Sequence, residues 1–157
     1  MRAQPEDAGD LTDLYHDAYR PWSTVGLRFK ASYQPVPFTK NQITEREIYA
    51  VRDKSRVIAT VCVQEKSARG IGRHLYLSKL AVAPDYQRRG IAGELLQFAE
   101  QVAAQRGVGT IRLDTAKRAK SNLALYRKYD YEVVKEFKHP SSRHRSVLFE
   151  KHVPKNK

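Results

Sequence analysis

The stretch from Leu80 to Leu96 constrains the fold most, because it joins an apolar strand to an amphipathic helix through a glycine-containing loop. The apolar run ends at Pro84, and from Ile91 onward apolar residues recur at three- and four-residue spacing. Gly90 stands at the junction, where the first backbone N–H groups of a helix have no partner within the helix. The pattern predicts a strand, a loop and a helix start that can bind an anionic group.

The residues around Gly90 fit a phosphate ligand. Gly90 has no side chain to keep a ligand away from the backbone, and Ala92 has only a methyl group. Arg88 and Arg89 add positive charge beside these amides. The stretch lacks the lysine of a P-loop and the three-glycine spacing of a dinucleotide fold. On spacing alone, an ordinary glycine at a tight turn is therefore an equal alternative.

The run Leu-Ala-Val-x-Pro, followed by Gln87-x-x-Gly90-x-Ala92 and later by a segment with Asn122 and Tyr126, resembles the GNAT superfamily of acetyl-CoA-dependent N-acetyltransferases. The resemblance implies an α+β fold, with a mixed, twisted β-sheet flanked by helices in a single domain over residues 1–157. It also implies acetyl-CoA as the co-substrate and direct transfer of the acetyl group to an amine in a ternary complex. It says almost nothing about the acceptor.

The resemblance also implies site residues. Those assigned to acetyl-CoA binding are Leu80, Val82, Gln87, Arg88, Arg89, Gly90, Ile91, Ala92, Gly93 and Asn122. Tyr126 is assigned as the catalytic acid, because a phenol is better matched than water to protonating the departing thiolate. The alternatives are an aromatic packed on a helix face for Tyr126 and a simple cap for Asn122.

The general base is the open position. Some family members place a glutamate on the fourth strand where this chain has Tyr76, and a tyrosine is a poor base at neutral pH. Asp114 and Glu65 lie near predicted strand ends, and a water relay is an equal alternative. No metal-ligand spacing and no nucleophile elbow is visible, so we predict neither a metal site nor a covalent acyl-enzyme.

Two other function classes are alternatives to an acetyltransferase, and the positive charge of the chain suggests the first of them. A net charge of +12 on 157 residues favours phosphate-bearing partners, so a nucleic-acid or ribosome-associated module is one alternative. The basic residues are spread along the chain without a nucleic-acid motif, and two clusters, 88–89 and 117–120, flank the predicted phosphate site. A nucleic-acid partner is thus disfavoured but stays open. A non-catalytic acyl-CoA-binding protein is the other alternative.

Three features of the sequence predict the cellular compartment of the protein. No apolar run is long enough to cross a membrane, and the N-terminus leads into a polar stretch rather than a signal peptide. The single Cys62 cannot form an internal disulfide. We therefore expect a cytoplasmic protein without a membrane partner. The resemblance implies a small-molecule or peptide amine as acceptor and a possible homodimer.

The N-terminal third is predicted to be helical and to face the acceptor. A helix is expected over Pro5–Tyr19 and should end at Pro21, and only Met1–Ala3 could supply the short strand that the family places before it, so that strand is minimal or missing. By resemblance, residues 20–42 form a second helix and a loop on the acceptor side. The aromatic residues there could line the acceptor pocket or fill a small core; they are Trp22, Phe29, Tyr33 and Phe38.

The remaining chain alternates strands and helices. Strands are predicted at 45–52, 56–65, 74–82, 110–115, 131–137 and 145–153, with a loop over Lys66–Arg73. The family commonly has a bulge near Ser78-Lys79, and we expect it here. The helix after Gly90 should stop at Gly107 or Gly109, and Ser121 should cap a short helix.

Overall fold

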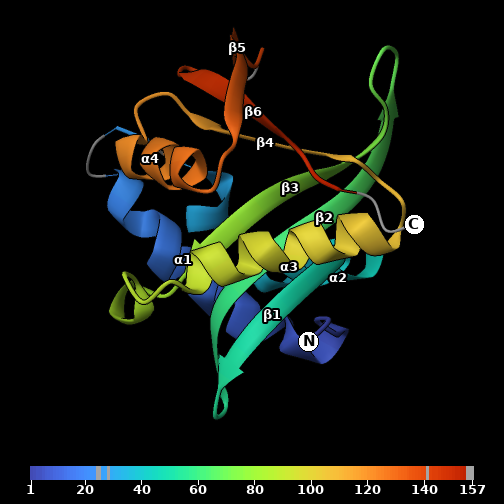
Figure 1. The fold of residues 1–157 in the computed structure, drawn as a ribbon. Helices are drawn as coiled ribbons and strands as arrows, with labels where there is room; N and C mark the ends of the chain where they lie inside the picture. Colours follow the sequence, from blue (N-terminus) through green and yellow to red (C-terminus); the bar gives the residue numbers. More distant parts are fainter. Residues whose placement is uncertain (24–25, 28, 141, 155–157) are drawn as a thin grey trace. The chain divides into compact units, whose positions relative to one another are not determined.

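A computed structural model describes residues 1–23, 26–27, 29–140 and 142–154 of the chain. Six strands in the described residues form a mixed sheet in the order β1-β2-β3-β4-β6-β5 (Figure 1). The helices are α1 (Ala8–Ser23), α2 (Val36–Glu45), α3 (Ile91–Gln105) and α4 (Lys120–Lys128), and the strands are β1 (Glu47–Asp53), β2 (Arg56–Ala68), β3 (Gly72–Val82), β4 (Thr110–Ala116), β5 (Glu132–Lys138) and β6 (Arg145–His152). The predicted α+β class, with a mixed sheet flanked by helices, is confirmed.

The chain divides into two compact units. The first comprises residues 1–63 and 79–95, and the second comprises residues 64–78 and 96–157. Strands β2 and β3 and helix α3 run through both units. The single domain predicted over residues 1–157 stays a prediction.

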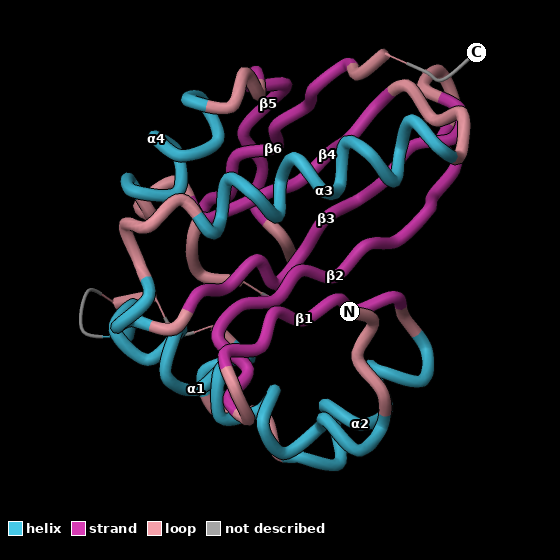
Figure 2. Tube along the Cα trace, turned by 60° about the horizontal axis from the view of Figure 1, so that its bottom comes forward, coloured by secondary structure: helices cyan, strands magenta, loops and turns pink. Residues whose placement is uncertain are grey.

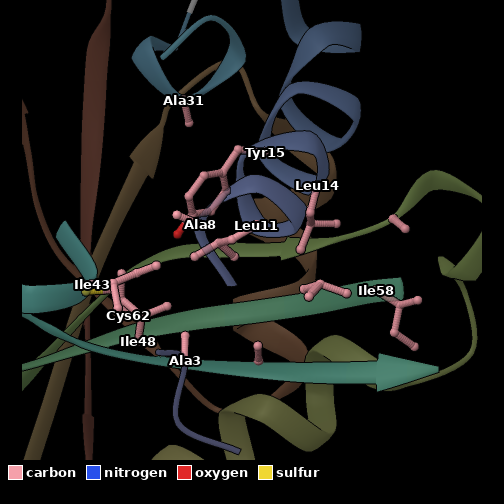
Figure 3. Close-up of a cluster of buried hydrophobic side chains, with 13 residues drawn as sticks. Ala3, Ala8, Leu11, Leu14, Tyr15, Ala31, Ile43, Ile48, Ile58 and Cys62 are labelled. Atoms are coloured by element: carbon pink, nitrogen blue, oxygen red, sulfur yellow. The ribbon is translucent and has the colours of Figure 1, made fainter. Parts of the chain in front are cut away.

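In the first unit, α1 packs its apolar face on the antiparallel hairpin of β1 and β2 (Figure 3). Leu11, Leu14 and Tyr15 recur at helical spacing on α1, and they are buried with Ile48 of β1 and Cys62 of β2. Helix α2 packs beside α1 (Figure 2). Removing these apolar side chains from water stabilises the unit, at roughly 25 cal/mol for each Å² buried.

The first residues of the chain pair with β1 through an isolated bridge, and the minimal or missing N-terminal strand stays a prediction. Arg2 forms an isolated antiparallel bridge with Tyr49 of β1. The Ala3 N–H donates to the Ile48 carbonyl at 2.7 Å. This pairing adds a single bridge beside β1.

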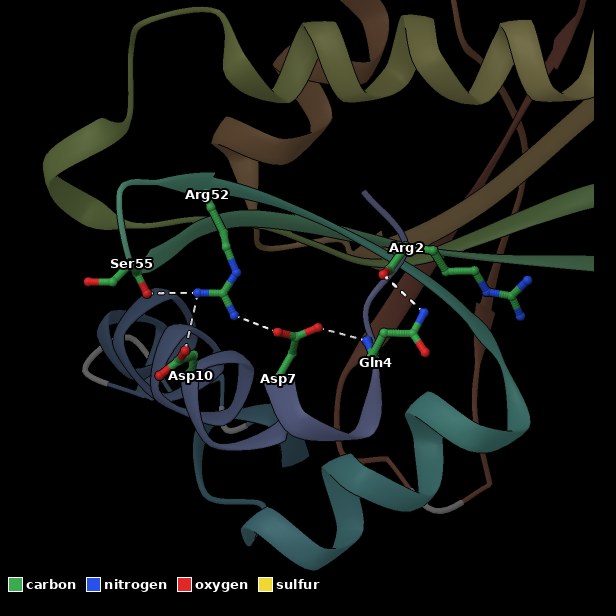
Figure 4. A network of polar contacts seen from close by, with 6 residues as sticks. All are labelled: Arg2, Gln4, Asp7, Asp10, Arg52 and Ser55. Atoms are coloured by element: carbon green, nitrogen blue, oxygen red, sulfur yellow. Dashed lines mark hydrogen bonds and ion pairs between the residues drawn. The ribbon is translucent and has the colours of Figure 1, made fainter.

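Arg52 on β1 anchors the start of α1 (Figure 4). Its guanidinium donates to the Asp7 carboxylate at 2.5 Å, to Asp10 at 3.2 Å and to the Ser55 carbonyl at 2.7 Å. The other oxygen of Asp7 accepts the backbone N–H of Gln4 at 2.7 Å, which satisfies a donor at the helix start. The Gln4 N–H and then Arg52 hold the pKa of Asp7 below its usual value.

The prediction that Pro21 ends the first helix is wrong, because α1 continues to Ser23. Proline lacks a backbone donor and crowds the preceding turn, but near a helix end few hydrogen bonds are affected. The Ser23 hydroxyl donates to the Arg20 carbonyl at 2.7 Å and so satisfies an acceptor of this last turn. The expected second helix is α2, which passes the predicted limit at Gln42 and ends at Glu45.

In the second unit, β3 pairs in parallel with β4 over Leu75–Leu77 and Ile111–Leu113. Strand β6 pairs antiparallel with both β4 and β5. The Tyr126 ring of α4 packs edge-on against Phe149 of β6, with ring centroids 5.5 Å apart, and lies 6.2 Å from the Tyr131 ring. Helix α4 is thus held by aromatic packing on the strand that joins the two antiparallel pairs.

Two residues with left-handed backbone end the helices of the second unit. Gly107 has φ 66° and follows α3 after one intervening residue, so its predicted role as the stop is confirmed. Asp130 has φ 68° after α4, at the place where the resembled family often has glycine. The Tyr131 N–H donates to the Tyr126 carbonyl at 3.0 Å and closes this end of the helix. An aspartate therefore supplies the turn that glycine usually makes.

Two boundary predictions in the second unit are wrong. The loop predicted over Lys66–Arg73 is shorter, since β2 extends to Ala68 and β3 begins at Gly72. The side chains there are mostly exposed and polar, so no apolar pattern marks these strand ends, which are held by backbone pairing. Ser121 does not cap α4, because Ala119 is the cap residue and offers no side-chain hydrogen bond.

Candidate active site

The loop before α3 has a backbone shaped to present its amides. Arg88 and Gly90 both have left-handed φ, 65° and 81°. A Cβ placed on Gly90 would meet no heavy atom within 4 Å, so the protein leaves open the space that a ligand near this backbone would need. The Glu94 N–H donates to the Gly90 carbonyl at 3.0 Å, while the N–H groups of residues 91–93 precede the first helical hydrogen bond. These features fit an anionic group such as the pyrophosphate of coenzyme A.

Polar contacts within the first unit fix the shape of this loop. Asp85 accepts two hydrogen bonds from Arg56, at 2.7 and 2.9 Å. The Tyr86 hydroxyl donates to the Asp53 carboxylate, and the Arg89 guanidinium lies 4.8 Å from the centroid of the Tyr86 ring. The hydrogen bonds from Arg56 lower the pKa of Asp85, so this ion pair persists across the neutral range. The loop is therefore preorganised by the turn between β1 and β2.

The strand end before the loop is also tied to its surroundings. The Gln87 side-chain amide donates to the Val82 carbonyl at 3.1 Å, so Gln87 closes the loop on itself. The Leu80 carbonyl accepts the Tyr19 hydroxyl at 3.4 Å. The assignment of Leu80, Val82 and Gln87 to acetyl-CoA binding stays a prediction, as does that of Arg88 to Gly93. Among these residues, Ile91 and Ala92 are half-buried.

Lys79 has left-handed backbone, φ 51°, within β3. This agrees with the predicted bulge near Ser78-Lys79. Its ammonium group donates to the Gln34 side-chain oxygen at 3.4 Å and lies 5.4 Å from the centroid of the Tyr15 ring. No role is predicted for Lys79 from the sequence, although a basic residue at the predicted bulge of an apolar strand could have marked it as a candidate.

The aromatic residues predicted for the acceptor side have different surroundings within the first unit. Trp22 and Phe29 pack edge-on, with ring centroids 6.5 Å apart. The Lys30 ammonium lies 3.9 Å from the centroid of the Phe38 ring, and Tyr33 is 52% exposed. Their role as the lining of an acceptor pocket stays a prediction.

In the second unit, Tyr126 is buried, with 6% of its surface exposed. Burial, and then the Asp114 carboxylate, raise the pKa of the Tyr126 phenol. The phenol therefore keeps its proton at neutral pH, as a proton donor must. The ring packs against Phe149, as the alternative packing role predicts. The catalytic role uses the hydroxyl of the same ring, so this packing is compatible with both roles.

Asn122 links α4 to β4. Its side-chain amide donates to the Thr115 hydroxyl at 3.1 Å, and its backbone N–H donates to the Ala119 carbonyl at 3.0 Å. The side chain therefore does not cap its own helix, which argues against the simple-cap alternative. Its assignment to acetyl-CoA binding stays a prediction.

The three candidate bases lie in the second unit and have different partners. The Tyr76 hydroxyl donates to the Asp114 carboxylate. Burial, and then this hydrogen bond, raise the pKa of Tyr76, so its phenol stays protonated and cannot accept a proton near neutral pH. Glu65 accepts two hydrogen bonds from Arg73, both at 3.2 Å, as a structural ion pair does. Asp114 and Glu65 are both exposed carboxylates, and Asp114 is the one that accepts the hydrogen bond of the Tyr76 phenol.

Residues 1–23, 26–27, 29–140 and 142–154 hold neither a metal-binding cluster nor a membrane-spanning helix. No three or more His, Cys, Asp or Glu side chains in those ranges stand close enough together to hold a metal ion. In the same part of the chain, no helix combines the length and the apolar character needed to span a membrane. Cys62 is a buried cysteine of β2.

Comparison with known proteins identifies relatives in sequence. A model of the acetyltransferase (GNAT) family matches residues 10–131. The chain is 30% identical over 117 residues to S-(2-succino)cysteine N-acetyltransferase from Bacillus subtilis (strain 168), which covers 73% of this chain. The match spans 66% of the length of that relative.

Comparison with solved structures gives the same fold. The structure of yncA from Salmonella typhimurium with its cofactor acetyl-CoA has a TM-score of 0.75 and 10% identity, over 100% of this chain and 94% of that one. Arabidopsis thaliana NAA60, in complex with a bisubstrate analogue, has a TM-score of 0.76 and 18% identity, over 98% and 96% of the two chains. The resemblance noted in the sequence is confirmed. The chain belongs to the GNAT family of acetyltransferases.

Proposed function

We propose that this GNAT acyltransferase moves the acetyl group of acetyl-CoA directly to the nitrogen of an amine, with both substrates bound together. The observation that carries the proposal is the loop before α3. Left-handed backbone at Arg88 and Gly90, with open space above Gly90, supports an anion held on backbone amides. Solved relatives in fold bind acetyl-CoA or a bisubstrate analogue, which is consistent with this assignment.

The proposal assigns acetyl-CoA to residues of β3, the loop and α4. The amides at the start of α3, Gly90 to Gly93, bind the pyrophosphate, and Arg88 and Arg89 add charge. Leu80 and Val82 contact the pantetheine arm with their backbone, and Asn122 contributes a side-chain amide. The anchors Asp85 and Tyr86 hold the loop in this shape before any ligand arrives.

Two proton transfers complete the chemistry. Tyr126 donates its phenolic proton to the departing sulfur, since a phenol holds its proton at neutral pH. The amine loses its proton to ordered water or enters already neutral, because Tyr76 holds its own proton against Asp114. The reaction breaks the carbonyl–sulfur bond, forms the carbonyl–nitrogen bond and leaves a free thiol.

The acceptor is proposed to be a small-molecule or peptide amine. The Bacillus subtilis relative is named for S-(2-succino)cysteine, so this amino acid is the first acceptor to test. We further propose a cytoplasmic protein that can act as a homodimer. Acyl-CoA binding without catalysis and nucleic-acid binding are the outcomes against which the experiment is designed.

The test is an amine panel in which thiol release from acetyl-CoA is followed and the N-acetyl product is identified by mass. The panel contains S-(2-succino)cysteine, amino acids each paired with its carboxamide, polyamines and short peptides. We expect at least one amine to release thiol and gain one acetyl group in equal amounts. Coenzyme A binding without any acetylated amine would leave a binding protein instead. RNA binding that falls steeply with salt, without acetyl-CoA binding, would favour the basic module.

A further inference from the structure

The ammonium group of Lys79 reaches from β3 towards α1 and the segment before α2, all within the first unit. The left-handed backbone of Lys79 interrupts the regular alternation of β3, so its side chain need not follow its neighbours. The ammonium group lies 5.4 Å from the centroid of the Tyr15 ring on α1. It donates to the side-chain oxygen of Gln34 at 3.4 Å.

A buried polar network sets the orientation of Gln34, which is 0% exposed. Its side-chain nitrogen donates to the Thr39 hydroxyl at 2.7 Å and to the Gln42 side-chain oxygen at 3.0 Å. Its backbone carbonyl lies 2.8 Å from Nε2 of His16. Because a satisfied buried network holds one conformation, the Gln34 side-chain oxygen is presented to Lys79 in a fixed position.

The Gln34 oxygen satisfies one of the three N–H donors that an ammonium group carries. Among the described residues, no carboxylate forms an ion pair with Lys79. The charged side chains that act on it are basic: Arg46 after α2 and, more weakly, Lys30, with the Cys62 thiol of β2 as the opposing group. Burial, and then Arg46, lower the pKa of Lys79 to about 8. A half-buried cation in this setting is stabilised by an anion supplied from outside the chain.

A row of aromatic rings runs beside the same strand. Ring centroids are 6.3 Å apart for Tyr15 and Tyr19, 5.6 Å for Tyr19 and Phe29, and 6.5 Å for Phe29 and Trp22. The Tyr19 hydroxyl donates to the carbonyl of Leu80, the residue after Lys79. The described part of the first unit therefore places two features next to the strand assigned to the pantetheine arm. They are a row of aromatic rings and a lysine ammonium group that no carboxylate of these residues neutralises.

We propose that Lys79 binds a carboxylate of the acceptor, so that the preferred acceptors are amines carrying an acidic group, such as free amino acids. This inference rests on the proposed function, because it names the acceptor class of the same site. The half-buried rings of Tyr19, Phe29 and Trp22 contact the apolar part of such an acceptor, and the Gln34 oxygen holds the ammonium group in place. Lys79 is thus a specificity residue that binds an anion, and its effect is confined to acidic acceptors.

The obvious competing role for Lys79 is that of general base. A base must be neutral before it accepts a proton, and its loss lowers turnover for every amine alike. An anion-binding lysine must be charged, and its loss weakens only the acceptors that carry the anion. The two roles therefore separate in a comparison of acidic and neutral acceptors.

The experiment compares kcat/KM for L-phenylalanine and L-phenylalaninamide, and for each other amino acid–carboxamide pair that the wild type acetylates. The variants are Lys79→Met, Lys79→Arg and, as a matched loss of one positive charge, Lys40→Met on the exposed face of α2. We expect Lys79→Met to lower kcat/KM for the acids at least 10-fold, through KM, and for the amides less than 3-fold. Lys79→Arg should recover part of the loss, and Lys40→Met should change neither acceptor.

A second measurement separates this inference from the proposed function. Binding of L-phenylalanine in the presence of coenzyme A is measured by calorimetry for the wild type and Lys79→Met. If no amine is ever acetylated but binding still depends on Lys79, the proposed function fails and the anion site stands. If acids and amides are acetylated and lose rate equally in Lys79→Met, or if neither is affected, the anion site is wrong while the acetyltransferase stands.

Discussion

The Tyr76 hydroxyl on β3 donates a hydrogen bond to the carboxylate of Asp114 on β4. Tyr76 stands where the sequence resemblance places a glutamate in some family members. The carboxylate beside it, together with burial, raises the pKa of the phenol and keeps it protonated. This position therefore holds a hydrogen-bonded pair in place of a free carboxylate, and we propose that the amine loses its proton by a route that does not use Tyr76.

The first prediction concerns this pair. Free alkylamines have pKa values near that of lysine, so at pH 7 only about one molecule in a thousand is neutral. With water as the proton acceptor, kcat/KM for the best amine should keep rising with pH until the amine titrates. Tyr76→Phe should leave the shape of that profile unchanged, and Glu65→Gln should leave its height unchanged as well. If Asp114→Asn removes an ionisation and most of the activity while acetyl-CoA still binds, Asp114 is the base.

The second prediction concerns Gly90. Gly90→Val should weaken acetyl-CoA binding by more than 10-fold, about 1.4 kcal/mol, because a branched side chain enters the space above the amides. Gly70 is a matched control, since its φ of 85° and its empty surroundings resemble those of Gly90. Both variants should lose a similar free energy of unfolding, roughly 1–2 kcal/mol, from the positive φ. Calorimetry giving the same acetyl-CoA affinity for both variants would remove the ligand from this loop.

The third prediction concerns Tyr126. Tyr126→Phe keeps the packing against Phe149 and removes the proton, so kcat should fall about 10²-fold with little change in acetyl-CoA affinity. Tyr131→Phe is the control, because Tyr131 packs beside Tyr126 and its buried hydroxyl has no hydrogen-bond partner among the residues that the structure describes. Its kcat should match that of the wild type. Equal turnover in the two variants would assign Tyr126 to packing alone.

The fourth prediction concerns the pH dependence of stability at Asp7. The folded-state pKa of Asp7 lies below its ordinary value of 3.8, so its charge stabilises the fold above that pH. Asp7→Asn should lower the free energy of unfolding by about 1–2 kcal/mol at pH 7. The difference between variant and wild type should shrink as the pH falls below 3.8 through the folded-state pKa. Asp13→Asn, on the exposed face of α1, should have no such effect; a pH-independent loss in Asp7→Asn would contradict the ion pair as its cause.

Local patterns in the sequence predicted most of the fold. Runs rich in β-branched and aromatic residues located the hairpin of β1 and β2, and Pro84 and Gly90 located the loop before α3. These features depend on near neighbours in the chain, which the sequence displays directly. The end of α1 was missed although its cause is also local, because a hydrogen bond from Ser23 to the Arg20 carbonyl offsets part of the effect of Pro21.

The candidate site was predictable where a residue acts through its own backbone and less so where it acts through a partner. The loop at Gly90 belongs to the first kind. The pairing of Tyr76 with Asp114 joins residues that are 38 positions apart, and that of Lys79 with Gln34 joins residues 45 apart. No local rule connects such residues, so their protonation and charge could be judged only after the strands and helices were placed.

The most direct test of direct acetyl transfer is a single-turnover reaction with acetyl-CoA labelled in its carbonyl carbon. Enzyme in excess is mixed with the labelled acetyl-CoA and the best amine, and the label is located by mass spectrometry at successive times. We predict that the label passes from acetyl-CoA to the amine in one step, with one free thiol for each N-acetyl product and no label on the protein. Label that accumulates on the protein before it reaches the amine, or that stays in acetyl-CoA with every amine, would contradict this account.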